Sequence, residues 1–138
     1  MNKYILDINV VSETRKPRPH GAVTQWLSGL EAGRTFVSAL TLGELQVGVE
    51  KTRRQDPQKA EEIESWVDLL AAVYEVLPMD ALCFREWARI MDGKPPELVE
   101  DAMIAATARV HRLIVATRNE RDFKQLAVRT FNPFKSQA

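Results

Sequence analysis

The stretch Tyr4-Ile5-Leu6-Asp7-Ile8-Asn9 places an acidic side chain directly after a short apolar run near the start of the chain. A short apolar run that ends at polar residues is consistent with a buried strand. A carboxylate at the end of such a strand is poorly hydrated, and like charges beside it would disfavour its ionised form further. Asp7 is therefore the first residue for which the sequence suggests a function.

Three later segments repeat this arrangement, with an acidic or amide side chain at the end of an apolar strand or near the start of a helix. Two unit charges ~4 Å apart repel by roughly 4 kcal/mol at an effective dielectric of ~20, so converging carboxylates would destabilise the fold without a cation. Divalent cations prefer such hard oxygen ligands. The segments are Thr41-Leu42-Gly43-Glu44-Leu45, residues 100–107 with Asp101, and residues 115–123 with Asn119 and Asp122.

Apolar strands alternate with helical segments along the chain, with no repeat or linker. This order predicts a three-layer α/β/α domain with a short central parallel sheet of four to five strands, and residues 1–138 as a single domain. Helix caps are predicted at Ser38, at Asp56 before Pro57, and at Asp80. Strands are predicted at residues 4–6, 36–37, 76–77, 113–116 and 128–131, and helices at 22–30, 39–49, 57–73, 81–91 and 97–112.

The predicted layout brings the polar residues together, because ligands of open α/β sheets bind at the carboxyl ends of the strands. Asp101 shares a helical face with Ile104, Ala105 and Ala108, so that face should pack on the sheet. The side chains expected to meet at this edge are Asp7, Asn9, Glu44, Asp101, Asn119 and Asp122.

The composition is that of a globular protein, with 45% hydrophobic and 28% charged residues. The 19 basic and 19 acidic residues cancel, so a polyanionic partner would have to be held by local basic groups. Each of these groups could also be ordinary solvated surface. The candidates for RNA binding, which flank the acidic segments, are Arg15, Lys16, Arg18, Arg118 and Arg121.

No stretch of the sequence has the ~18 apolar residues of a membrane span, and Asp7 interrupts the first apolar run. A single cysteine, Cys83, lies between apolar residues and is expected in the core. These features predict a cytoplasmic protein with no membrane association.

The motifs around Asp7, Glu44, Asp101 and Asn119, together with the closing Phe131-Asn132-Pro133-Phe134, resemble the PIN-domain toxins of the VapC and FitB type over essentially the whole chain. The resemblance implies an endoribonuclease that uses Mg²⁺ or Mn²⁺, cleaves cellular RNA, which is tRNA in several family members, and inhibits translation. It also implies a homodimer and inhibition by a cognate antitoxin of the VapB or FitA type, which commonly blocks the site with a basic side chain. Operator DNA would be bound only indirectly, through the antitoxin.

Carried over residue by residue, the resemblance makes Asp7, Glu44 and Asp101 the metal-binding acids. Glu44 would be either a ligand or a base that positions water. Asn119 matches a fourth site position that is often Asp, so Asp122 could supply the remaining carboxylate. Supporting roles are expected for Asn9, Ile8 and Thr117, whereas Asn9 and Asp122 could instead be caps and Glu44 a solvated residue.

Ile8 departs from the family pattern, which usually has Thr or Ser at this position. Isoleucine lacks the hydroxyl that could bond to a metal-bound water or a neighbouring carboxylate. One alternative is therefore a catalytically attenuated module that binds an antitoxin or nucleic acid. A second is a phosphatase of the haloacid dehalogenase type, although that family needs an acid where Asn9 stands.

Overall fold

A computed structural model describes residues 1–135 and has a five-stranded sheet at its centre. All neighbouring strands are parallel, and their order is β3-β2-β1-β4-β5. This arrangement confirms the predicted α/β class and the short parallel sheet. The strands are β1 (Tyr4–Leu6), β2 (Thr35–Ser38), β3 (Glu75–Leu77), β4 (Ile114–Ala116) and β5 (Thr130–Phe131).

Side-chain caps begin several of the helices where the sequence predicted them. Ser38 Oγ accepts the N–H of Leu40 at 3.1 Å, and the Oδ1 atoms of Asp56 and Asp80 each accept an N–H three residues later. The helices are α1 (Ile8–Val11), η1 (Ser12–Arg15), α2 (Gly21–Ser28), α3 (Ala39–Arg53), α4 (Pro57–Val73), α5 (Ala81–Met91), η2 (Pro96–Leu98), α6 (Val99–His111) and α7 (Glu120–Lys124).

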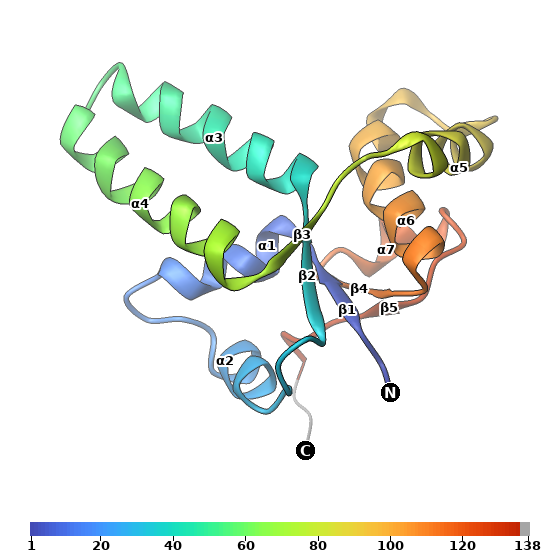
Figure 1. The fold of residues 1–138 in the computed structure, drawn as a ribbon, viewed down its shortest axis with the longest axis horizontal. Helices are drawn as coiled ribbons and strands as arrows, with labels where there is room; N and C mark the ends of the chain where they lie inside the picture. Colours follow the sequence, from blue (N-terminus) through green and yellow to red (C-terminus); the bar gives the residue numbers. More distant parts are fainter. Residues whose placement is uncertain (136–138) are drawn as a thin grey trace.

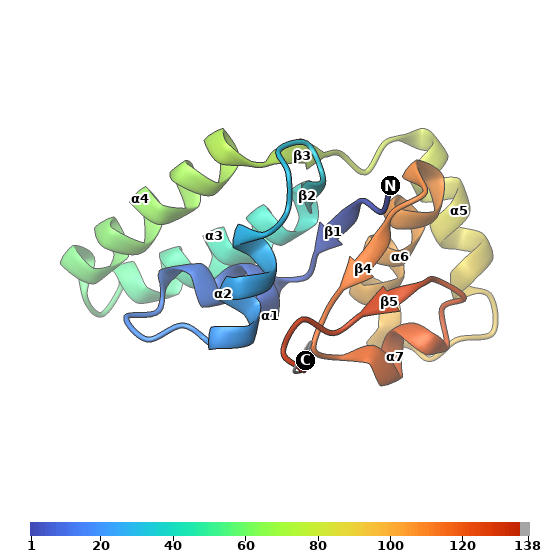
Figure 2. The same ribbon diagram turned by 90° about the horizontal axis from the view of Figure 1, so that it is seen from below.

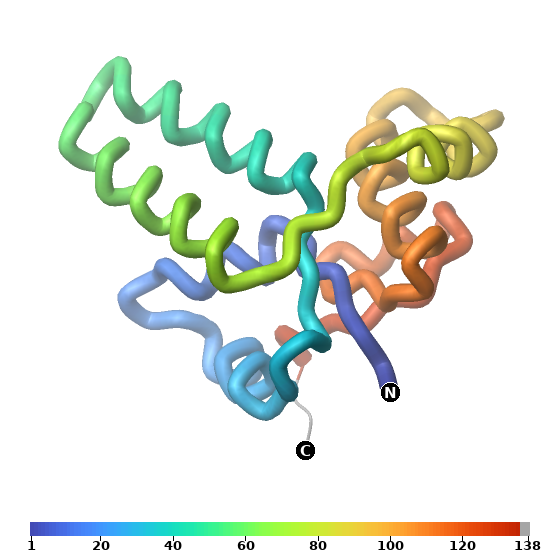
Figure 3. Tube along the Cα trace, viewed as in Figure 1, coloured from blue at the N-terminus to red at the C-terminus, as the bar shows by residue number. Residues whose placement is uncertain are grey.

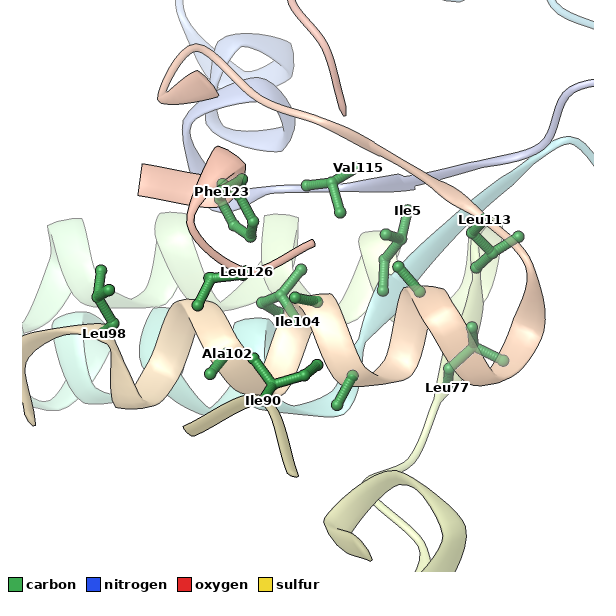
Figure 4. Close-up of a cluster of buried hydrophobic side chains, with 13 residues drawn as sticks. Ile5, Leu77, Ile90, Leu98, Ala102, Ile104, Leu113, Val115, Phe123 and Leu126 are labelled. Carbon is green, nitrogen blue, oxygen red and sulfur yellow. The ribbon is translucent and has the colours of Figure 1, made fainter. Parts of the chain in front are cut away.

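The two faces of the sheet are covered by different groups of helices (Figures 1 and 2). Ile5 and Val115 point to one face and pack with Ile104 of α6 and Phe123 of α7, as Figure 4 shows. Tyr4, Leu6, Ile114 and Ala116 alternate to the opposite face, where they pack against α1 and α2. The outcome is the three-layer arrangement that the alternation of strands and helices predicted.

The α3 and α4 helices form a long antiparallel pair that extends away from the sheet (Figure 1). Val49 of α3 meets Ala60 and Val67 of α4 in a small apolar cluster of its own. Side chains of this pair therefore lie beyond the carboxyl ends of the strands. One of them is Glu44, in the second turn of α3.

The strand order reverses at β1, which has β2 on one side and β4 on the other. Figure 3 traces β1 from the chain start into the middle of the molecule, where α1 follows it at once. Such a reversal leaves a crevice at the carboxyl ends of the two central strands. Asp7 follows β1 at this crevice, and Thr117 follows β4. The strand order therefore brings these two candidate residues to the same edge of the sheet.

Several predicted bounds were wrong in detail, and α3 ends at Arg53 instead of Val49. The last strand begins at Thr130 instead of Val128, and a 3-10 turn occupies residues 96–98 before α6. The segment after Thr117, predicted as a loop, contains the short helix α7, because Phe123 is buried there with no exposed surface.

Within residues 1–135, no helix is long and apolar enough to span a membrane. Cys83 is buried as expected.

Candidate functional site

Asp7 occupies the turn between β1 and α1, where it is only 7% exposed. Its Oδ1 accepts the N–H of Ile8 at 2.9 Å, so Asp7 is the N-cap of α1. Its Oδ2 accepts the hydroxyl of Thr117 at 2.8 Å and the side-chain amide of Asn9 at 3.3 Å. Burial raises the pKa of Asp7, and the hydrogen bonds from Thr117, Ile8 and Asn9 oppose that rise.

Thr117 and Asn9 connect Asp7 to the segment that follows β4. The hydroxyl of Thr117, which is fully buried, also accepts the N–H of Asn119 at 2.9 Å. Asn9 Oδ1 accepts the N–H of Arg118 at 3.1 Å. Asn9 is therefore not the helix cap that its position could have suggested. It joins two strand ends and orients the carboxylate of Asp7.

Glu44 lies half-buried on α3 and faces the same edge of the sheet. Burial is the largest cause that raises its pKa to about 7, followed by a side-chain hydrogen bond with Glu100 and by the charges of Glu100, Asp7 and Asp101. A hydrogen bond between two carboxyl groups requires a proton on one of them. Glu44 is therefore not a solvated helix residue, and Glu100 is a site residue that the sequence analysis did not single out.

Asp101 completes the cluster from the first turn of α6. Burial raises its pKa to about 6, and the nearby charges of Asp7, Asp122 and Glu100 add to the rise. Asp122, on α7, accepts the side-chain amide of Asn119 at 2.8 Å. The carboxylate of Asp122 is thus the one that acts on Asp101, while Asn119 orients Asp122.

Several carboxylates at the site repel one another. Beyond burial, the charges of Asp7 and Asp101 raise the pKa of Glu44, and the charge of Asp7 raises that of Asp101. The oxygens of these three acids are of the hard type that Mg²⁺ and Mn²⁺ prefer. Across residues 1–135, no three acidic, histidine or cysteine side chains are already close enough together to hold an ion. The chemistry of these carboxylates at one edge of the sheet fits a divalent cation.

Ile8, the residue without a hydroxyl, begins α1 and lines an open groove together with Glu44. The hydroxyl that bonds to Asp7 comes from Thr117 instead. The orientation of Asp7 therefore does not depend on a hydroxyl at position 8. Whether Ile8 attenuates the activity stays a prediction.

The basic residues that flank the site have different surroundings. Lys16 pairs with Glu13, a second buried acid that the sequence analysis missed and that also accepts the N–H of His20. The guanidinium of Arg118 lies 3.8 Å from the ring centre of Phe134. The remaining candidates, Arg15, Arg18 and Arg121, are exposed.

The acidic cluster predicts how the stability of the metal-free protein depends on pH. Folding raises the pKa of Glu44 to about 7 and that of Asp101 to about 6, so the folded state binds these protons more tightly than the unfolded state. The free energy of unfolding should therefore increase as the pH falls from about 8 to about 5. Thermal melts in chelator measure this change. In Glu44→Gln, the free energy of unfolding should depend less on pH. An equal pH dependence in the variant and the parent would contradict the prediction.

The comparisons with known proteins point to one family. The model of the PIN domain matches residues 4–129 of the chain. The chain is 34% identical to the toxin FitB of Neisseria gonorrhoeae, in an alignment that covers 94% of this chain and 97% of that protein. It is also 34% identical to the VapC ribonuclease Y4jK of Sinorhizobium fredii, with coverages of 95% and 97%.

Solved structures share the fold over nearly the whole chain. The crystal structure of FitAcB from Neisseria gonorrhoeae is similar with a TM-score of 0.84 and 32% identity, and it covers 96% of this chain and 99% of that chain. The DNA-bound VapBC from Salmonella typhimurium is similar with a TM-score of 0.75 and 27% identity, with coverages of 96% and 99%.

Proposed function

Because this chain belongs to the PIN-domain family and resembles FitB and VapC proteins from end to end, we propose that it is the ribonuclease toxin of a toxin-antitoxin module. The proposed reaction is endonucleolytic hydrolysis of cellular RNA, which would inhibit translation, with Mg²⁺ or Mn²⁺ as the cofactor. Transfer RNA is the first substrate to test.

The observation that carries this proposal is the convergence of Asp7, Glu44 and Asp101 at the reversal point of the sheet. Asp7 follows β1, Glu44 lies on α3 and Asp101 lies on α6. The charges of Asp7 and Asp101 add to burial in raising the pKa of Glu44. A buried cluster of like charges costs stability, so its presence needs a function. A metal-dependent phosphodiester nuclease uses such a cluster to bind its cation.

Asp7, Glu44 and Asp101 would hold the cation, with Glu100 and Asp122 in reach of the same cluster. Bound there, the ion would activate a water and neutralise charge on the phosphate. Hydrogen bonds from neighbouring side chains orient these carboxylates. Thr117 and Asn9 donate to Asp7, and Asn119 donates to Asp122. If Glu44 does not bind the ion directly, it would position the attacking water and accept its proton.

The two alternative functions differ in how much support they retain. The phosphatase hypothesis is not supported, because the chain belongs to another family and Asn9, where that family needs an acid, bonds to Asp7 and Arg118. The attenuated-module hypothesis rested on Ile8. It loses part of its basis, because Thr117 already supplies a hydroxyl to Asp7.

A cleavage assay on two substrates separates these functions. Purified protein with Mg²⁺ or Mn²⁺ should cut a mixture of cellular RNA into fragments and should leave p-nitrophenyl phosphate intact. Hydrolysis of the small phosphoester without RNA cleavage would support the phosphatase. Inactivity on both substrates would support the attenuated module.

We further propose an antitoxin of the VapB or FitA type as the partner, with operator DNA bound only through it and a homodimer as the assembled form. The related VapBC structure is a DNA-bound complex, and the exposed Leu82 and Phe84 of α5 give this chain an apolar surface for such contacts. A basic side chain of the antitoxin would be attracted to the Asp7–Glu44–Asp101 cluster.

This placement predicts that the antitoxin inhibits cleavage in competition with the cation. Raising Mg²⁺ or Mn²⁺ should weaken the inhibition, because both bind the same carboxylates. RNA fragment yield at a fixed antitoxin concentration measures the effect. An antitoxin that binds tightly while cleavage continues at the full rate would contradict it.

A further inference from the structure

An open groove leads away from the acidic cluster between η1 and the α3–α4 pair. Its volume is about 390 Å³, which lies within the roughly 300–1,000 Å³ range of small-ligand sites. Ile8 and Glu44 line its inner end, so the groove is continuous with the site of the proposed reaction. Figure 2 shows the α1–η1 segment running beside the helical pair.

The two sides of the groove differ in chemistry. Leu45, Ile63 and Trp66 give the side formed by α3 and α4 an apolar lining, whereas Arg15 and Lys16 make the opposite rim basic. Lys16 is held by the buried Glu13. Arg15 forms no ion pair with any residue of the described chain, 1–135, so its charge is available to a ligand.

Trp66 is fixed at the boundary between these two sides. Its indole N–H donates to the hydroxyl of Thr14 at 3.1 Å, and the guanidinium of Arg15 lies over its ring, 5.8 Å from the centroid. An aromatic ring beside an available cation is a combination that binds single-stranded nucleic acid, because the bases stack and the phosphates pair with the cation.

We propose that this groove binds the nucleotide next to the cleaved phosphate of the RNA substrate, an inference that rests on the proposed function. The base would lie against the apolar side formed by Leu45, Ile63 and Trp66, and the adjacent phosphate would contact Arg15. The positive rim favours a polyanion as the occupant. The acidic cluster repels RNA, and the zero net charge of the chain does not attract it. The positive rim supplies that attraction.

Ile8 has a specific role in this arrangement, because it stands where the groove meets the acidic cluster. Its branched apolar side chain lines the groove together with Glu44 of the cluster. A rigid apolar wall discriminates bases by size and shape. Ile8 is thus a specificity-determining residue, and its lack of a hydroxyl affects which sequence is cut.

Sequencing of the cut sites in a random RNA pool tests the inference. In Ile8→Ala, the preference at the one nucleotide position beside the cut should weaken about tenfold, because a shortened wall discriminates less. Ile8→Val should shift the same position by a smaller amount, which keeps the test valid if the alanine variant folds poorly. Leu69→Ala, an apolar truncation on the exposed surface of α4, should leave the profile unchanged.

Arg15→Gln tests the phosphate contact by direct binding. Its effect is measured with labelled RNA in chelator, on a protein inactivated by Asp101→Asn, so that no cleavage intervenes. The variant should bind all sequences more weakly and reduce the slope of log K against log salt by about 0.7, because one phosphate contact on a single strand is lost. Arg85→Gln on α5 is the matched control, because Arg85 is exposed and forms no ion pair within residues 1–135, and it should bind as the parent does.

The possible failures are distinguishable. If the parent protein cleaves no RNA, the proposed function is wrong, and this inference is wrong as well. If the parent cleaves RNA but both Ile8 variants keep its cut-site profile, the groove does not bind the substrate base. If Arg15→Gln weakens the antitoxin complex and leaves RNA binding unchanged, the groove belongs to the protein partner.

Discussion

Asp101→Asn should abolish RNA cleavage while leaving the metal-free protein as stable as the parent or more stable. The amide keeps the shape of the side chain but is a poorer ligand for a divalent cation. It also removes a carboxylate whose pKa is raised to about 6 by burial and by the charges of Asp7, Asp122 and Glu100. Loss of activity without loss of stability should therefore occur in the same variant.

Two measurements separate this outcome from simple damage to the fold. Fragment yield from RNA at saturating Mg²⁺ or Mn²⁺ reports activity, and a thermal melt in chelator at pH 7.5 reports stability. Asp68→Asn, on α4 and exposed, serves as the matched control and should alter neither. A clear loss of metal-free stability in Asp101→Asn would identify Asp101 as a structural residue.

Thr117→Val should slow cleavage about ten- to a hundredfold. The hydroxyl of Thr117 donates to Asp7 Oδ2 and accepts the N–H of Asn119, and valine can do neither. A hydrogen bond to a charged group is worth roughly 1.5–3 kcal/mol, and each ~1.4 kcal/mol of transition-state stabilisation is about tenfold in rate. Valine preserves the volume of this buried position, so the fold should survive.

Thr117→Ser is the conservative variant that distinguishes orientation from packing. It restores the hydroxyl and leaves a methyl-sized gap, so its rate of RNA cleavage should stay near that of the parent. The kcat of each variant measures the effect at saturating substrate. If the serine variant were as slow as the valine variant, the packing of Thr117 would matter and its hydrogen bond to Asp7 would not.

Local sequence signals were sufficient to predict much of the fold. Ser38, Asp56 and Asp80 are good N-caps whose side chains accept nearby N–H groups, and these bonds form within three residues. The alternation of apolar strands and helices likewise depends on local chemistry. By contrast, the order of the strands depends on which helices cover which face, which no local pattern records.

The site was predictable where an acid follows a strand and obscure where its role depends on tertiary contacts. Asp7 stands directly after β1, so its position is evident from the sequence. Glu100 acquires its role from Glu44, which lies far away in the chain on α3. Similarly, the choice between Asn119 and Asp122 needed the geometry of α7, in which the amide of Asn119 orients the carboxylate of Asp122.

Ile8 illustrates a different limit of sequence reasoning. Its departure from the family pattern suggested a missing hydroxyl, and so a weakened enzyme. The structure supplies the hydroxyl from Thr117 and turns Ile8 toward the groove. A substitution that looks like a loss in an isolated motif can thus be a change in the shape of a binding surface.

The most direct test of the metal-dependent ribonuclease is a titration of RNA cleavage against free Mg²⁺ or Mn²⁺, with protein first freed of metal by a chelator. The metal-free protein should cleave no RNA, and activity should rise and saturate as the ion is added, while the Asp101→Asn variant remains inactive throughout. RNA cleavage at the full rate in excess chelator would show that the carboxylate cluster does not act through a cation.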